Sequence, residues 1–453
     1  MLRKSLVALS ILLLQSLPGP ELTWAQGTSA ILAQQKPQSS ISRYYDPNTG
    51  LSADDAVAYA LANNGELAAV RSEVEAARGL VQQASLRPNP QLDIERKEQI
   101  NGGDNDTMVG AMLPLELGGR RSARILVAQR ELQMKERFLE DRERLLAAEV
   151  RSKFGEGLGE LLKLGLTEDL LLTTNQGYQL VEARVTEGRT APLEQNLVLV
   201  EVNRIRSVRE GNQGKVEVAL LELRNLMGMS PEESLRLRGD LDHLIERLPA
   251  LAISTEIALR ERPDLQAARA LEALAEARIA QARSGGRIDA SLTGKYELMN
   301  FGFPQRGFNS SGELVPIMGR FHSVAVGITF DVPVRNRNLG LIAAAIAEKT
   351  AATQRREFGE LTVRHEVASA FARYQSAARA AEIYRVGVQG QANANLEVVR
   401  QTYELGSKNL LDVIAEQRRF IEVQTGYIEA LVNTYQARVE IERATAHSRL
   451  IKR

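Results

Sequence analysis

Apolar side chains recur every seven residues along two long stretches of the chain. The repeating positions are Ile125, Leu132, Leu139 and Leu146 in the first stretch, and Ile414, Ile421, Ile428 and Tyr435 in the second. No proline occurs between positions 115 and 191, so about 70 residues can run as one helix of roughly 105 Å. An apolar period of seven over such a length predicts a coiled coil. Turns at Gly188 and Gly406 would then reverse the chain, so each long helix is expected to form a hairpin with the helix after it.

Four shorter segments alternate apolar and polar residues with the period of a β-strand. We expect strands at about residues 91–97, 107–115, 288–298 and 322–333. Such strands are long enough to cross a bilayer at a tilt, and their alternation is typical of an outer-membrane barrel. An ordinary half-buried sheet alternates in the same way, but it rarely lies between helical hairpins on the order of 100 Å long. Residues 299–321, rich in Gly, Asn and Ser, are expected to form a loop.

The order of these elements repeats. One helix is expected before each pair of strands, from Ser52 to about Leu86 and from about Ser254 to Arg283, and Ser52 with Asp55 resembles a capping box. Each half therefore reads helix, strand, strand, long helix, helix, which indicates an internal duplication. The segments are a first repeat at 51–228 with its long hairpin at 119–228, a linker at 229–253, a second repeat at 254–446 with its hairpin at 338–446, and a tail at 447–453.

The N-terminus has the pattern of a secretory signal peptide. Arg3 and Lys4 precede an apolar run that is too short to span a membrane, and small residues around Ala25 suit cleavage. We expect residues 1–25 to be removed and residues 26–50, rich in Gln, Ser and Pro, to form an extended arm. No cysteine follows the leader, so no lipid anchor is expected.

Composition narrows the functional classes. Basic and acidic residues both number 57, which gives no overall field for binding nucleic acid. The chain has no cysteine, and its four histidines, His243, His322, His365 and His447, lack any metal-ligand spacing. We therefore expect no enzyme activity, no cofactor and no metal site in the wall of the protein.

Four strands are too few to close a membrane barrel. Known outer-membrane barrels begin at eight strands, and open edges in lipid would leave backbone groups unpaired at several kcal/mol each. Three copies would supply twelve strands. The predicted fold class is therefore mainly α with a membrane β-barrel, in which a homotrimer places a 12-stranded barrel in the outer membrane on top of an α-helical tunnel.

Several short motifs support this architecture. They are Ala60 to Leu67, Arg262 to Leu265, Leu86 to Pro90, Leu115 to Arg120, Tyr403 to Gly406 and Asn409 to Ile414. In this order the motifs resemble the TolC family of outer-membrane efflux proteins, from about Leu51 to Ala446. The Leu-Glu-Leu-Gly-Gly-Arg stretch is similar to the CzcC-like branch, which serves heavy-metal efflux.

The resemblance implies a passive conduit in the outer membrane of a Gram-negative bacterium that extends into the periplasm. Its partners would be outer-membrane lipid, a periplasmic adaptor (a membrane fusion protein) and an inner-membrane pump of the RND type. Heavy-metal cations are the implied cargo, and drug export or type I protein export is the alternative. A helical belt around the tunnel would include the linker at 229–253.

The resemblance also implies functional positions at the two helix turns. The periplasmic tip, where an adaptor docks, would include Arg184, Gly188, Arg189, Thr190, Tyr403, Gly406, Ser407, Leu410 and Leu411. Asp412 matches the first acidic ring that narrows the pore in the family. Ala415 departs from the second ring position, but Glu416 is adjacent, and Glu194 is the counterpart of Asp412 in the first half. A ring of carboxylates on a narrow axis would favour cations. Asp412 could instead lie on an exposed helix face with no role in the pore.

Two further classes of protein share some of these features. A periplasmic adaptor is also exported and also contains a coiled-coil hairpin, but it would have one hairpin between small β domains. A purely structural coiled coil would lack amphipathic strands. The two hairpins and duplicated strands of this chain favour the duct over both.

Overall fold

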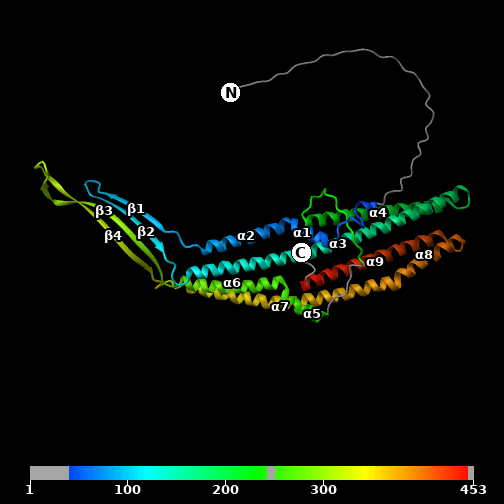
Figure 1. The fold of residues 1–453 in the computed structure, drawn as a ribbon. Coiled ribbons are helices and arrows are strands. Elements are labelled where there is room, and N and C mark those ends of the chain that lie inside the picture. Colours follow the sequence, from blue (N-terminus) through cyan, green and yellow to red (C-terminus); the bar gives the residue numbers. More distant parts are fainter. Residues whose placement is uncertain (1–39, 242–249, 447–453) are drawn as a thin grey trace, which may run out of the picture. The chain divides into compact units, whose positions relative to one another are not determined.

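A computed structural model describes residues 40–241 and 250–446 of the chain. The expected leader, most of the expected N-terminal arm, and the tail lie outside the described residues. The first half contains η1 (Ser40–Arg43), α1 (Ala53–Asn63), α2 (Gly65–Ser85), β1 (Gln91–Glu98), β2 (Asn105–Pro114), α3 (Arg120–Thr186) and α4 (Pro192–Met227). The second contains α5 (Leu251–Glu261), α6 (Pro263–Gly285), β3 (Asp289–Phe308), β4 (Leu314–Asp331), α7 (Leu339–Ile383), the π-helical η2 (Tyr384–Val388), α8 (Gln389–Glu404) and α9 (Leu410–Thr445). The predicted class, mainly helical with a duplicated strand pair, is confirmed (Figure 1).

The sheet joins the two halves of the chain. Its order is β1-β2-β3-β4, with every neighbouring pair antiparallel. One row of paired residues, Ile94, Val109, Tyr296 and Val324, crosses all four strands. These side chains are 68%, 39%, 41% and 77% exposed, so the sheet presents an apolar face that nothing in the described chain covers. Within the described ranges the outer edges of β1 and β4 pair with no other strand.

The second strand pair is much longer than the sequence predicts. Residues 299–321 were expected to be a loop, but most of them extend β3 and β4, and the turn is confined to the residues between Phe308 and Leu314. The reason lies in the alternation, which changes face. Up to Leu298 the apolar positions are even-numbered, whereas beyond it Phe301 and Phe303 are odd-numbered and lie on the opposite face. The two-residue period of apolar positions is therefore interrupted at Leu298, although the strand continues beyond it.

Both helices that precede the strands are interrupted. The expected helix from Ser52 divides at Asn64, whose side chain caps α2 by accepting from the backbone N–H of Leu67. The expected helix from Ser254 divides at Arg262, because Pro263 suits the first turn of a new helix. The capping box of Ser52 and Asp55 is confirmed.

Residues 40–50 are not the extended arm that their composition predicts. They begin with η1 and place Tyr44 in the interior, where its hydroxyl donates to Glu217 of α4 at 2.7 Å. Tyr45 and Leu51 form isolated bridges with Leu237. The aromatic ring of Tyr44 gives this polar segment enough apolar area to be held against the helices.

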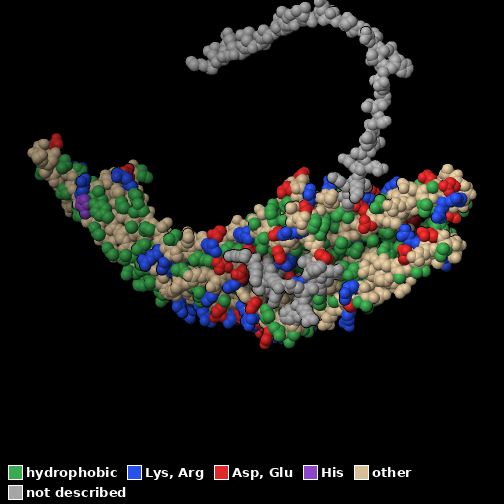
Figure 2. Space-filling model, turned by 45° about the vertical axis from the view of Figure 1, so that its right-hand side comes forward, with side chains coloured by type: hydrophobic (Ala, Val, Ile, Leu, Met, Phe, Trp, Pro, Cys, Tyr) green, Lys and Arg blue, Asp and Glu red, His purple; other side chains and the backbone are tan. Residues whose placement is uncertain are grey.

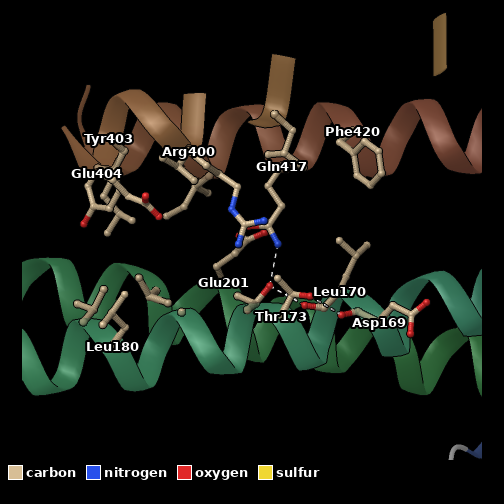
Figure 3. Close-up of a pocket in the computed structure, with 18 of the residues that line it drawn as sticks. Asp169, Leu170, Thr173, Leu180, Glu201, Arg400, Tyr403, Glu404, Gln417 and Phe420 are labelled. Carbon is tan, nitrogen blue, oxygen red and sulfur yellow. Dashed lines mark hydrogen bonds between the residues drawn. The ribbon is translucent and has the colours of Figure 1, made fainter. Parts of the chain in front are cut away.

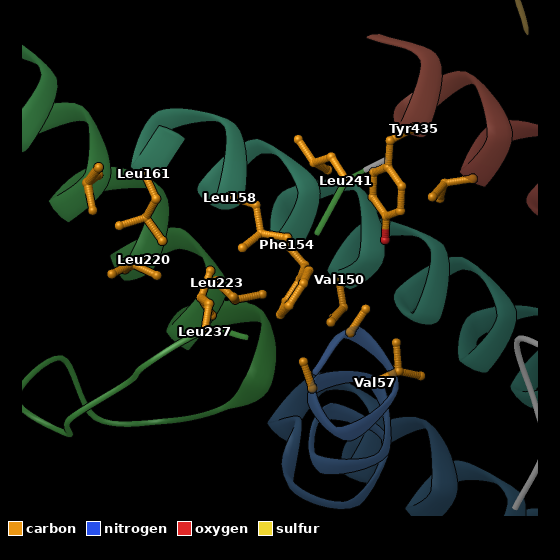
Figure 4. Close-up of a cluster of buried hydrophobic side chains, with 14 of the residues drawn as sticks. Val57, Val150, Phe154, Leu158, Leu161, Leu220, Leu223, Leu237, Leu241 and Tyr435 are labelled. Atoms are coloured by element: carbon orange, nitrogen blue, oxygen red, sulfur yellow. The ribbon is translucent and has the colours of Figure 1, made fainter. Parts of the chain in front are cut away.

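The largest core lies midway along α3. Phe154 is fully buried there between α1, α4, α9 and the segment that contains Leu237 (Figure 4). Gly155 allows close approach of α9, because a Cβ atom at this position would overlap the ring of Tyr435. Burial raises the pKa of Tyr435 to about 12. Since α3 contains 67 residues, or about 100 Å of helix, the sheet and the turn at Gly188 lie at its opposite ends.

Candidate functional site at the hairpin tips

The two helical hairpins end in turns of the same geometry. Gly188 has φ +71° and Gly406 has φ +75°, both in the left-handed region that favours glycine. The residue after each glycine donates its N–H to a carbonyl five residues earlier: Arg189 to Arg184 at 2.8 Å, and Ser407 to Thr402 at 2.9 Å. This is the arrangement of a Schellman motif. The predicted duplication therefore extends to the turns.

The structure brings the two turns together. Leu410 and Ile414 of α9 form a small apolar cluster with Val181 of α3 and with Val198 and Val202 of α4. This cluster fixes the tip of the second hairpin against the first.

A polar contact between the tips lies beside this cluster. The Tyr403 hydroxyl donates to Oε2 of Glu194 at 3.1 Å. Burial and the negative charge of Glu194 raise the pKa of Tyr403, and nearby Arg184 opposes this effect. Tyr403, Glu194 and Arg184, predicted at separate turns, are thus neighbours in space.

The remaining tip residues differ in exposure. Gly188, Arg189, Gly406, Ser407 and Leu411 are exposed, and Arg184 and Thr190 are half-buried. Leu410 is buried in the cluster between the hairpins, so its side chain is not on the surface of the folded chain. Sequence reasoning could not separate Leu410 from Leu411, because they are adjacent on the same helix.

The three carboxylates predicted to narrow the pore have different local partners, and Glu194 accepts from Tyr403. Asp412 completes a capping box with Asn409: its N–H donates to the Asn409 side chain at 3.0 Å, and its own carboxylate accepts from the Asn409 N–H at 3.2 Å. Glu416 is buried and accepts from Arg419 at 2.9 Å. In the described part of the chain, no group of His, Asp or Glu side chains is arranged to hold a metal ion.

A groove of about 430 Å³ lies behind the tip between the two hairpins (Figure 3). At its floor Glu201 of α4, 1% exposed, accepts from Arg204 and from Arg418 of α9, with closest distances of 2.6 and 2.8 Å. Beside this pair Gln417 donates to Thr174 of α3 at 2.7 Å. Sequence reasoning missed this contact, although a carboxylate on the apolar stripe of a helix was a detectable signal.

The ion pair at Glu201 predicts a dependence on pH. Burial favours the neutral acid, but hydrogen bonds from Arg204 and Arg418 outweigh it and lower the pKa of Glu201 below its usual value. Stability from this pair is therefore present at neutral pH and is lost as the pH falls below about 4.5 towards the lower folded-state pKa. Glu201→Gln should weaken the contact between hairpins by about 2 kcal/mol at pH 7.

This effect can be measured with spin labels, since the chain has no native cysteine. Labels at Glu187 and Lys408 report the distance between the tips by pulsed electron resonance. The distance distribution should broaden in Glu201→Gln at pH 7 and in the unsubstituted protein once the pH falls below the folded-state pKa of Glu201, and it should be unchanged in the surface control Glu210→Gln. Equal distributions in Glu201→Gln and the control at pH 7 would show that the pair does not hold the tips.

Among the described residues, no helix has both the length and the apolar character required to cross a bilayer.

Residues 56–229 and 255–447 match the model of the family described as outer membrane efflux protein. The chain is 23% identical to the cobalt-zinc-cadmium resistance protein CzcC of Cupriavidus metallidurans over 87% of its own length and 89% of that protein. It is 26% identical to outer membrane protein OprJ of Pseudomonas aeruginosa over 85% and 82% of the two chains. Its fold is similar to a crystal structure of CusC, with a TM-score of 0.72, 19% identity, and coverage of 89% and 93%.

Proposed function

Because the chain belongs to the outer membrane efflux protein family, which forms the outer-membrane channels of tripartite efflux systems, we propose that three copies of it form a conduit for heavy-metal cations. The channels of this family are passive conduits and not enzymes. In the proposed assembly an inner-membrane pump of the RND type and a periplasmic adaptor deliver the cargo, and the trimer carries it across the outer membrane.

The sheet carries the argument for the trimer. Its uncovered apolar face suits lipid, but within the described chain the outer edges of β1 and β4 are unpaired, and they would leave backbone groups unsatisfied in lipid unless further strands close the sheet. Three copies give the twelve strands of a closed barrel, with the apolar face outward and six helical hairpins below it.

Heavy-metal cargo is supported by two observations. The chain is similar to CzcC along most of both sequences, and the stretch from Leu115 to Arg120 resembles the CzcC-like branch. Deletion of the gene should lower resistance of its host to cobalt, zinc or cadmium ions while leaving drug resistance unchanged. A strain that loses drug resistance alone would assign the conduit to drug export.

The exposed and half-buried residues of the tip are the proposed docking surface for the adaptor. They are Arg184, Gly188, Arg189, Thr190, Gly406, Ser407 and Leu411, with Tyr403 positioned behind them by Glu194. We leave Leu410 and Glu416 out of the docking and pore surfaces, because both are covered by their own chain. Asp412 remains the proposed ring residue, since it lies six positions beyond the turn glycine and retains partial exposure.

Asp412→Asn should lower the cation selectivity of the reconstituted pore. The amide oxygen can still accept from the Asn409 N–H, so the helix cap is kept while three negative charges leave the proposed ring. The measurement is the reversal potential across a planar bilayer in a salt gradient, with Glu404→Gln at the exposed tip as the control for a lost charge elsewhere. An unchanged reversal potential in an assembled trimer removes Asp412 from the constriction.

A further inference from the structure

Arginines gather at all four places where the chain passes between a helix and a strand. These crossings are residues 85–91, 114–124, 283–289 and 331–339, and here we name them together the arginine collar. The collar contains eight arginines, Arg87, Arg120, Arg121, Arg124, Arg283, Arg287, Arg335 and Arg337, three acidic residues and no lysine. Its excess of five positive charges contrasts with a whole chain that is neutral. Neither the fold nor the tip chemistry requires such an excess.

The four crossings touch one another, so the arginines form one surface. Arg121 donates to the carbonyl of Ser85 at 2.6 Å, which joins the first crossing to the second. Arg120 donates to the carbonyl of Arg287 at 3.2 Å, which joins the second to the third. Asn338 donates to the carbonyl of Ala282, at the end of α6, at 3.3 Å, which brings the fourth beside the third. Figure 2 shows basic side chains on the visible face where the strands meet the helices.

The collar separates into arginines that hold the backbone and arginines that face outward. Arg120 forms an ion pair with Asp289, and Arg124 forms one with Glu116. In contrast, the exposed Arg87, Arg283, Arg335 and Arg337 have no acidic partner within the described ranges, and their guanidinium groups are open to a ligand. A second copy of the chain could not neutralise them with its own collar. Of the three acidic residues there, two are already paired and only Asp331 is left.

Exposed apolar residues lie directly beside arginines of the collar. Ile288 is 50% exposed next to Arg287, and Val334 is 70% exposed next to Arg335. The apolar face of the sheet ends at this level. An apolar surface that gives way to arginines is the pattern of a membrane interface, where long basic side chains reach the headgroups.

We propose that the arginine collar binds the phosphates of anionic phospholipid headgroups in the leaflet at the helical end of the barrel. Guanidinium groups bind phosphate oxygens in a bidentate manner, which explains the use of arginine rather than lysine. The inference rests on the proposed function, because it requires the sheet to lie in a membrane. Three copies would surround the barrel with such sites and so fix its depth in the bilayer.

The test measures which lipids remain bound to the trimer. The full mature protein is reconstituted in vesicles of equal parts phosphatidylcholine and phosphatidylglycerol, then extracted in mild detergent, and the bound lipid is quantified by mass spectrometry. The unsubstituted trimer should be enriched in phosphatidylglycerol, and Arg335→Gln with Arg337→Gln should reduce the enrichment about threefold or more. Arg335→Lys with Arg337→Lys should keep part of it. Arg306→Gln with Arg320→Gln, which removes two charges towards the far end of β3 and β4, is the matched control and should have no effect.

Pore conductance in the same vesicles separates this inference from the proposed function. A conducting trimer without phosphatidylglycerol enrichment overturns the lipid site and leaves the channel intact, whereas the absence of any trimer or conductance overturns both. If the glutamine pair instead alters ion selectivity or the heat stability of the trimer without changing bound lipid, the arginines face the lumen or a neighbouring subunit, and the proposal is wrong.

Discussion

Replacing Gly406 with glutamate should abolish efflux while the channel still assembles. Gly406 holds φ +75°, a conformation that costs other residues about 1–2 kcal/mol, and no atom lies within 4 Å of a Cβ at this position. The folded chain can therefore accept the side chain. The bulk and charge of glutamate would, however, project from the exposed turn into the surface proposed for the adaptor. For the proposed heavy-metal cargo, cobalt, zinc and cadmium resistance of the complemented deletion strain measures export, and heat-modifiable trimer in the outer-membrane fraction measures assembly.

Two controls separate the causes of this effect. Gly406→Ala introduces the same backbone strain without bulk or charge, and it should keep most of the export. Gly390→Glu places the same charge on the exposed surface of α8, away from the turn and at ordinary helical φ, and it should be tolerated. Full resistance with Gly406→Glu would place the docking surface elsewhere. Loss of resistance with Gly406→Ala to the same degree would assign the defect to the turn itself.

Sequence patterns predict the parts of this fold that depend on local periodicity. The seven-residue repeat that includes Ile125 and Leu132 predicts α3, and the alternation of apolar and polar residues around Leu292 predicts β3 as far as Leu298. The same reasoning failed from residue 299 onward, because the apolar positions change face at Leu298 while the backbone continues as a strand. Where a strand passes into a different environment, its apolar residues move to the other face although the backbone stays extended.

Contacts between the two halves were beyond the reach of local patterns. Glu201 and Arg418 are more than two hundred positions apart, and only the packing of α9 on α4 shows that they pair. The link of Glu194 to Tyr403 depends on the contact of α4 with α8 at the tip, and the link of Arg120 to Asp289 depends on the position of α3 beside β3 at the other end of α3. The duplicated turns could be located from their glycines. Which of the neighbouring side chains are exposed and which are buried depends on the helical register of both hairpins, and local patterns do not give that register.

Gly155→Ala should cause the largest loss of stability among the changes considered for this chain. The added methyl group would overlap two carbon atoms of the ring of Tyr435, a residue of α9 whose side chain lies in the main core. The ring is 4% exposed and packed on several sides, so it cannot swing away without opening the core. Overpacking of a core typically costs about 1–3 kcal/mol, and the short contacts at Gly155 place this change at the upper end of that range.

The cost can be measured as a lower temperature for loss of the heat-modifiable trimer, and as lower yield in the outer membrane. Gly177→Ala is the matched control: it lies in the same helix, a Cβ there meets no atom within 4 Å, and alanine should stabilise the helix by about 0.5–1 kcal/mol. Opposite shifts in the two variants would show that Gly155 serves the contact between α3 and α9. If both variants raise the melting temperature, Tyr435 does not approach α3 as closely as the structure places it, and the main core is looser at this level.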